Sequence, residues 1–168
     1  IGSGKSYVAK SIGLPDFNAD SEVGKLYKND KKVFYKLKKV IPNHFGIFPI
    51  KKEDVSNAIL SNNKNLKKII KIIHFEIQKK MKKFLNNNKN KKIVILDIPL
   101  LLENRINKKK DILIFIQSKK SEVLKRLLKR PNFNKKLFKK FKKIQLPLDY
   151  KKKRSQFIIK NDFTKKSV

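Results

Sequence analysis

The stretch that decides the fold stands at the first residues of the chain and reads Ile1-Gly2-Ser3-Gly4-Lys5-Ser6. It matches the second half of the pattern G-x-x-x-x-G-K-[ST], in which glycines let backbone amides approach phosphate oxygens, Lys neutralises phosphate charge and Ser ligates Mg²⁺. A strand feeds such a loop and a helix follows it. We therefore expect a strand and the first loop glycine before Ile1, and a helix over residues 6–12 that ends at Gly13 and Pro15. The alternative for this segment alone is a glycine-rich turn with an incidental lysine.

Composition limits the class of protein. The chain has 168 residues, 39% of them hydrophobic, with 45 Lys+Arg against 13 Asp+Glu, a formal net charge of +32 and no Cys. The length suits one domain, and the apolar content is too high for a disordered basic tail. Without Cys there is no disulfide framework and no Cys-ligated metal. The longest apolar run, residues 93–102, is interrupted by Asp97, which argues against a membrane span; a reducing cytoplasm is the expected location.

The positive charge is a weak indication of a nucleic-acid partner. It comes almost wholly from Lys, accompanied by much Asn and Ile, and Arg stands only at positions 105, 126, 130 and 154. An AT-rich genome imposes this bias on any protein. A basic nucleic-acid-binding protein stays open as an alternative, although aromatic residues are not clustered with glycine as RNA-stacking surfaces require.

The apolar patterns predict alternating strands and helices. Residues 92–97 and 112–116 are short Ile and Val runs, as in strands buried on both faces of a parallel sheet. A helix over 121–129, with its leucines and valine on one side, separates the second run from a last strand over 157–159. The order predicts a doubly wound α/β fold.

Three further segments are predicted to be helical. Residues 64–85 keep an apolar helical period over several turns and predict one long amphipathic helix. Residues 20–60 predict shorter helices broken at Pro42 and around 46–49. Residues 130–153 predict a basic helical hairpin over the site, with a proline at each end of its helical part, Pro131 and Pro147.

Polar residues at predicted element ends are the candidates for chemistry. Asp97 closes an apolar strand, where a carboxylate would hold Mg²⁺-bound water. Asp20 follows a predicted strand end, which is the side of an open parallel sheet that binds ligands, and its alternative use is as a helix N-cap. Arg130 offers a planar fork for phosphate, against the alternative of an ordinary solvated basic run. His74 on the long helix is either a ligand or a residue at the core boundary.

Residues 97–103, Asp-Ile-Pro-Leu-Leu-Leu-Glu, resemble the D-x-P-L-L-x-E signature of dephospho-coenzyme A kinases. Further segments are similar to motifs of that family in the same order along the chain: 17–20 to I-D-A-D, 73–74 to H-P-x-[VI], 145–151 to Q-x-P-x-x-x-K, and 158–161 to V-I-x-N. The resemblance spans nearly the whole chain.

This resemblance implies a P-loop NTPase fold in three layers, one domain over 1–168 with a parallel sheet, a helical acceptor-binding insertion over 21–87 and a helical lid over 130–153. It implies an enzyme that uses ATP and Mg²⁺ to phosphorylate the ribose 3′-hydroxyl of dephospho-CoA, the final step of coenzyme A synthesis. A nucleoside or nucleotide kinase with another acceptor stays open, because loop chemistry does not fix the acceptor. Neither a membrane nor a nucleic acid is an expected partner.

The resemblance also implies roles for individual residues. It assigns ATP binding to Gly2, Ser3, Gly4, Lys5, Ser6 and Tyr7; catalysis to Lys5, Arg130 and Asp20, the last accepting the hydroxyl proton; acceptor binding to Asp20, His74 and Leu100; and Mg²⁺ to Ser6 and Asp97.

Four positions depart from the family pattern. Asn18 stands where the first Asp of a pair is usual, which leaves Asp20 as the carboxylate. Phe75 replaces a Pro after His74, so the helix entry there is expected to differ. Phe141 stands where an Arg is frequent, leaving lid contacts to Arg130 and nearby lysines. Ser155-Gln156 replaces Ala-Asp before the last strand.

Overall fold

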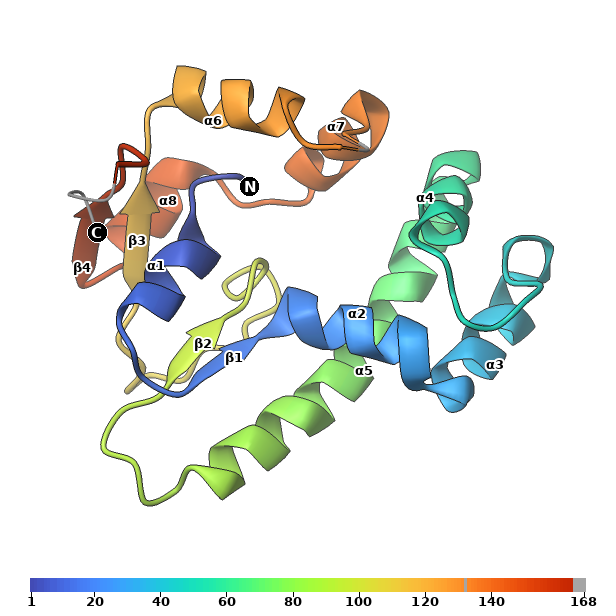
Figure 1. Cartoon of the computed structure of the whole chain (residues 1–168), viewed down its shortest axis with the longest axis horizontal. Helices are drawn as coiled ribbons and strands as arrows, with labels where there is room; N and C mark the ends of the chain where they lie inside the picture. Colours follow the sequence, from blue (N-terminus) through green and yellow to red (C-terminus); the bar gives the residue numbers. More distant parts are fainter. Residues whose placement is uncertain (132, 165–168) are drawn as a thin grey trace. The chain divides into compact units, whose positions relative to one another are not determined.

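The computed structural model describes residues 1–131 and 133–164 and divides into two compact units (Figure 1). The first unit consists of residues 1–16 and the described residues from Asp97 onward, and the second of residues 17–96. Both combine helices with short strands, as the predicted α/β class requires. The segment predicted as an insertion, 21–87, falls inside the second unit.

The first unit holds the loop of residues 1–4 and a parallel strand pair. Its elements, in chain order, are α1 (Lys5–Ser11), β3 (Ile114–Gln117), α6 (Lys120–Leu128), α7 (Lys135–Lys143), α8 (Leu148–Lys153) and β4 (Phe157–Lys160). β3 and β4 pair in parallel, from Ile114 opposite Phe157 to Gln117 opposite Lys160. The helix after the loop is confirmed, and it stops before Gly13, whose left-handed φ of 73° suits a helix C-terminus.

The second unit is mainly helical. Its elements are residues 17–18 of β1 (Asp16–Asn18), then α2 (Ala19–Asn29), α3 (Lys31–Val40), the 3₁₀ turn η1 (Pro42–His44), α4 (Lys52–Ser61), α5 (Asn63–Asn87) and residues 95–96 of β2 (Ile95–Asp97). β1 and β2 pair as a two-stranded sheet. Along the chain, the boundaries between the two units fall within these two strands, after residue 16 and after residue 96. The predicted long helix over 64–85 is confirmed as α5, and the predicted breaks at Pro42 and around 46–49 are confirmed.

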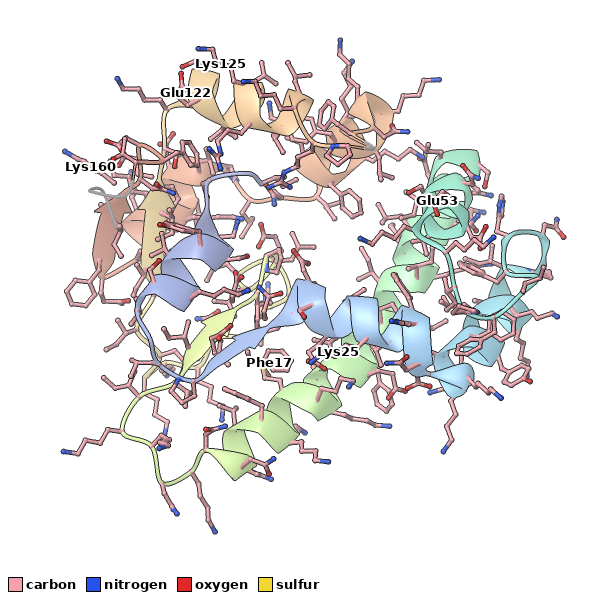
Figure 2. The ribbon with its side chains drawn as sticks, viewed as in Figure 1. Phe17, Lys25, Glu53, Glu122, Lys125 and Lys160 are labelled. Atoms are coloured by element: carbon pink, nitrogen blue, oxygen red, sulfur yellow. The ribbon has the colours of Figure 1, made fainter. Side chains whose placement is uncertain are left out.

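The core of the second unit forms along one face of α5. Leu66, Ile69, Ile73 and Ile77 recur at helical spacing and are all buried, and α5 contacts α2, α3 and α4. Phe17 of β1 adds a tilted ring contact to Phe84 of α5, with ring centroids 5.6 Å apart (Figure 2). The lysines of α5 lie on its other faces, and no helix within the described residues is long and apolar enough to cross a membrane.

The last strand, predicted over 157–159, is confirmed as β4, but the strands predicted over 92–97 and 112–116 are shorter and more exposed than predicted. β2 starts at Ile95 and β3 at Ile114, and Ile93, Ile112 and Ile114 are 62%, 67% and 44% exposed. Burial on both faces is therefore wrong for these residues. The reason is that, in the described part of the chain, each strand pairs with a single partner strand.

The helix predicted over 121–129 is confirmed as α6, on which Leu127 is buried while Leu124 and Leu128 are 49% and 60% exposed. One helical prediction needs correction. Pro147 does not end the helical part of the basic hairpin. It is the N-cap of α8, because its fixed φ and missing N–H are tolerated where a helix begins.

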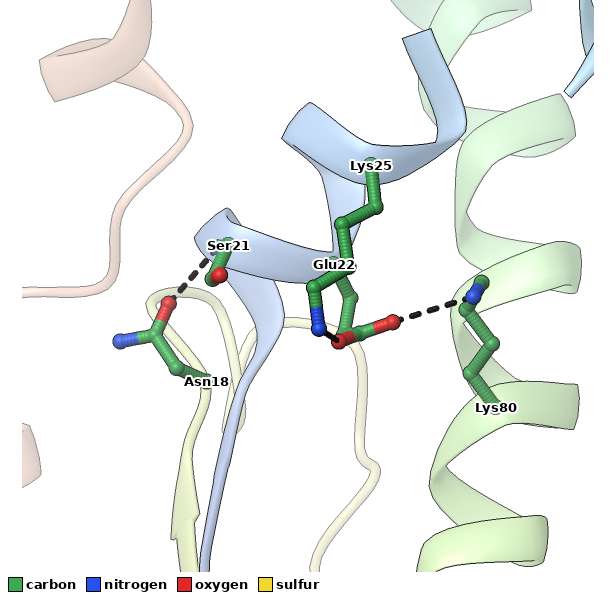
Figure 3. A network of polar contacts seen from close by, with 5 residues as sticks. All are labelled: Asn18, Ser21, Glu22, Lys25 and Lys80. Carbon is green, nitrogen blue, oxygen red and sulfur yellow. Dashed lines mark hydrogen bonds and ion pairs between the residues drawn. The ribbon is translucent and has the colours of Figure 1, made fainter. Parts of the chain in front are cut away.

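Carboxylate–lysine pairs tie helices of the second unit together. Glu22 on α2 contacts Lys25 at 2.5 Å and Lys80 on α5 at 3.0 Å (Figure 3). Burial alone would raise the pKa of Glu22, but the two lysines outweigh it and hold the pKa below the ordinary 4.5. By linkage, a lowered carboxyl pKa adds stability above pH 4.5 that is lost as the pH falls through the folded-state value.

We expect Glu22→Gln to lower the free energy of unfolding by about 1 kcal/mol at pH 7, since it breaks both ion pairs. The difference in stability from the parent chain should shrink as the pH falls below 4.5, because the Glu22 carboxyl of the parent then becomes protonated and neutral, like the Gln side chain. Urea unfolding at a series of pH values measures this. Glu122→Gln is the control: its pair with Lys125 (Figure 2) is 3.5 Å long and its side chains are 43% and 72% exposed, so little change is expected. Equal losses in the two variants at pH 7 would contradict the prediction.

Candidate functional site

The loop before α1 depends on two glycines with left-handed backbone. Gly2 and Gly4 have φ of 81° and 83°, a region that side-chain-bearing residues rarely adopt. Space forbids a side chain as well: a Cβ on Gly4 would lie 2.2 Å from Nδ2 of Asn161, and one on Gly2 would lie 3.0 Å from Leu127. Both predicted glycines are therefore required by backbone conformation and by close packing.

Two side chains stabilise the loop by donating hydrogen bonds to the same backbone carbonyl, that of Ser3. Nδ2 of Asn161 and Oγ of Ser118 donate to the Ser3 carbonyl at 3.0 and 3.1 Å. Asn161 is 2% exposed, its N–H donates to the Gln117 carbonyl, and its Oδ1 accepts from the Phe163 N–H. Ser118 and Asn161 directly follow β3 and β4, so both donors stand at the carboxyl ends of a parallel pair, where ligands bind in open sheets.

The sequence reasoning missed Ser118 and gave Asn161 no chemistry. Both follow predicted strands, which was the available signal. Their shared acceptor, the Ser3 carbonyl, however, lies more than 110 positions away in the chain. No local sequence pattern indicates a contact between residues so far apart.

The predicted ATP-site residues that follow the loop lie in the first turn of α1. Lys5 opens α1 and is half-buried, while Ser6 and Tyr7 in the same turn are exposed. Arg130 follows α6, in the same unit as the loop, and is exposed.

Asp97 has the placement predicted for it. It ends β2, is 7% exposed and belongs to the same unit as the loop. Within the described residues no group of three or more His, Asp or Glu side chains gathers to hold a metal ion. Mg²⁺ needs no such group, because it binds through one or two protein oxygens plus phosphate oxygens and water. A carboxylate such as that of Asp97 and a hydroxyl such as that of Ser6 are oxygen donors of the kind that Mg²⁺ prefers.

Leu100 lies in the turn that follows Asp97 and is half-buried. Its carbonyl accepts from the N–H of Asn104 at 3.1 Å, and Ile106 N–H donates to the carbonyl of Leu101 at 3.0 Å. These bonds close a turn over residues 100–106, which begins within the D-x-P-L-L-x-E segment.

Asp20 and His74 belong to the second unit. The alternative of Asp20 as N-cap is wrong: the N-cap of α2 is Asn18, whose Oδ1 accepts from the Ser21 N–H at 2.7 Å (Figure 3). Asp20 lies in the first turn of α2 and is exposed.

His74 is half-buried in the middle of α5, with its Nε2 3.5 Å from Nε2 of Gln78. Phe75, which stands where the family pattern has a Pro, lies inside α5, which begins at Asn63 and runs unbroken past His74. Phe75 is 53% exposed and lies under the Nζ of Lys79, 4.2 Å from the ring centroid.

Known proteins resemble the chain over its full extent. Residues 1–166 match the family described as Dephospho-CoA kinase. The dephospho-CoA kinase of Wolbachia sp. subsp. Brugia malayi is 33% identical, covering 100% of this chain and 88% of that protein. That of Bartonella quintana is 32% identical, covering 95% and 84%.

Two solved structures share the fold. TT1252 from Thermus thermophilus superposes with a TM-score of 0.75 at 21% identity, covering 99% of this chain and 87% of that one. Dephospho-CoA kinase from Campylobacter jejuni gives 0.60 at 23% identity, covering 98% and 85%. The α/β P-loop fold is thus confirmed, and the chain belongs to the dephospho-CoA kinase family.

Proposed function

We propose that the chain transfers the γ-phosphoryl group of ATP to the ribose 3′-hydroxyl of dephospho-CoA. The coarser activity follows from the family: the chain is an ATP-dependent kinase that phosphorylates dephospho-CoA in coenzyme A biosynthesis. The observation that carries the proposal is the loop in which Gly2 and Gly4 have left-handed backbone. Lys5 follows this loop directly, and the buried Asp97 belongs to the same unit. A chain without Cys suits a reducing cytoplasm, where we place the reaction.

Phosphoryl transfer requires little covalent chemistry from a protein. Charge on the transferred group must be neutralised, and the attacking oxygen must be held in line with the leaving oxygen. Loop amides over 2–7 would bind the phosphates, with Lys5 and Arg130 neutralising their oxygens.

Mg²⁺ would be held by Ser6 and Asp97 and, when bound, would neutralise charge that develops between the β- and γ-phosphates. Asp97 is suited to this because a buried carboxylate keeps a fixed position and holds few competing waters. Ser6 is exposed in the first turn of α1, so its hydroxyl is accessible to a ligand.

The acceptor side is assigned to the second unit. Asp20 would accept the 3′-hydroxyl proton, for which its carboxylate must come within about 2.6–3.2 Å of that hydroxyl. Its exposure in the first turn of α2 leaves the carboxylate accessible to a ligand. His74 and Leu100 are each proposed to contact dephospho-CoA.

The test is ADP release from MgATP with dephospho-CoA, adenosine, common nucleosides and nucleoside monophosphates as acceptors. Selective turnover of dephospho-CoA, with ³¹P NMR placing the new phosphate at the 3′ position, is the expected result. Turnover of a different acceptor would overturn the substrate while leaving the nucleotide site in place. Absence of MgATP binding would overturn both.

We expect Asp20→Asn to lower kcat by about 10²–10⁴-fold, the usual contribution of a general base. MgATP affinity should change less than twofold, because the assigned role of Asp20 is toward the acceptor. Steady-state kinetics and calorimetric MgATP titration measure the two quantities. Asp54→Asn, a change in the first turn of α4, is the control for loss of one helix-terminal carboxylate. A near-normal kcat in Asp20→Asn would remove the assignment of the base.

We expect Asn161→Asp to weaken MgATP binding by about tenfold or more, because a carboxylate cannot donate to the Ser3 carbonyl and adds negative charge beside the phosphate loop. Ser118→Ala removes the other donor to the same carbonyl without adding charge and should have a smaller effect. Calorimetric titration of both variants with MgATP measures the difference. Unchanged affinity in Asn161→Asp would show that the loop keeps its shape without this bond.

A further inference from the structure

Phe163 has a left-handed backbone although it carries a bulky side chain. Its φ is 69°, a region in which glycine is unstrained and other residues are strained. Two side chains hold this turn: Asn161 Oδ1 accepts from the Phe163 N–H at 2.9 Å, and Asp162 Oδ1 accepts from the Thr164 N–H at 2.8 Å. Strained residues persist where their surroundings fix them, and they gather at ligand-binding sites. A phenylalanine at this position is therefore explained by a use of its ring.

The ring of Phe163 touches both the loop of residues 1–4 and α6. Its Cε1 would lie 3.4 Å from a Cβ built on Gly4, an ordinary van der Waals distance, so the ring lies against this glycine. The guanidinium carbon of Arg126 on α6 lies 4.4 Å from the ring centroid. Arg126 is exposed, and water weakens a cation–π contact at an exposed site. The contact therefore returns little stability for the strain at Phe163.

The backbone of Phe163 also decides which way the Asn161 side-chain amide points. An N–H group can only donate, so the atom that faces the Phe163 N–H is the amide oxygen. The amide nitrogen is thereby directed to the Ser3 carbonyl, to which it donates at 3.0 Å. The turn at Phe163 thus reaches the loop twice, through the Asn161 amide and through the ring on Gly4.

We propose that Phe163 and Arg126 are positioning residues for ATP: Arg126 holds the Phe163 ring against Gly4, and Phe163 keeps the loop of residues 1–4 in the shape that binds phosphates. The inference rests on the proposed function. Gly4 is the N-cap of α1, and a glycine backbone is weakly restricted by itself. A loop that must be ordered when its ligand binds loses affinity, and a ring packed on Gly4 beforehand reduces that loss. Arg126 acts through the ring and does not touch ATP.

The first test is the Kd of MgATP by calorimetric titration, at a temperature well below the thermal midpoint Tm of each variant. Phe163→Gly removes the ring and leaves the left-handed backbone unstrained, so this variant should fold. We expect its Kd to rise by about three- to tenfold, the affinity lost when a loop segment is ordered on binding. Phe163→Tyr keeps the ring, and its Kd should stay within twofold of the parent chain. A Kd within twofold of the parent in Phe163→Gly, or an equal rise in both variants, would overturn the proposal.

Arg126→Met distinguishes positioning from direct contact with ATP. If Arg126 acts through the ring, this change raises the Kd in the parent chain and has no further effect in Phe163→Gly. Lys125→Met, at the neighbouring residue of α6 (Figure 2) with a side chain 72% exposed, is the matched control for loss of one positive charge and should stay within twofold. An equal rise from Arg126→Met in both backgrounds would show direct contact with ATP and overturn the proposal, as would a rise no larger than that in Lys125→Met.

Steady-state kinetics show whether the effect is confined to the nucleotide. In Phe163→Gly the KM for MgATP should rise together with the Kd, while the KM for dephospho-CoA stays within twofold, because the loop is assigned to ATP alone. General damage to the fold would raise both KM values, and that result would contradict the inference. If the parent chain binds MgATP but does not phosphorylate dephospho-CoA, the proposed function fails, while the Kd comparisons still decide the roles of Phe163 and Arg126.

Discussion

The nucleotide loop depends on the hydrogen bond that the Asn161 side-chain amide donates to the Ser3 carbonyl. This bond requires a glycine at position 4, because a Cβ there would collide with the same amide. Ser118 reaches the same carbonyl from the end of β3, and Asn161 stands at the end of β4. The loop therefore inherits its shape from the register of the β3–β4 pair. A slip of one residue would turn Asn161 to the other face of the sheet and remove the donor.

Acidic side chains are scarce in this chain, with 13 Asp+Glu against 45 Lys+Arg. Several of them form ion pairs between elements that are distant in sequence. Glu22 joins α2 to α5 through Lys80, and Glu76 joins α3 to α5 through Lys36 at 2.7 Å. Glu103 does the same for the turn after Asp97 and for α8. Because repulsion among so many lysines opposes compactness, each of these carboxylates counteracts a larger unfavourable field than it would in a neutral protein.

Features encoded within a few residues were predictable from the sequence. The apolar period gave α5, Gly13 marked the end of α1, and the carboxylate closing an apolar run identified Asp97. Exposure of Ile112 was not predictable, since the number of partner strands beside it is a property of the assembled sheet. The pairing of Glu103 with Lys151 was equally hidden, because 48 positions separate two side chains that only the folded turn and α8 bring together.

Asn18 shows how the chain can depart from its family pattern without loss of the local fold. Asn and Asp are equally good N-caps, so Asn18 keeps the bond to the Ser21 N–H and the start of α2 is preserved. What changes is charge: one carboxylate is lost, and Asp20 remains in a first turn where the helix dipole favours negative charge. Phosphoryl transfer with a loose transition state needs little basicity from the protein, so holding the acceptor oxygen in line matters more than the strength of the base. A single carboxylate, fixed at the start of a helix capped by Asn18, is therefore sufficient for the proposed role.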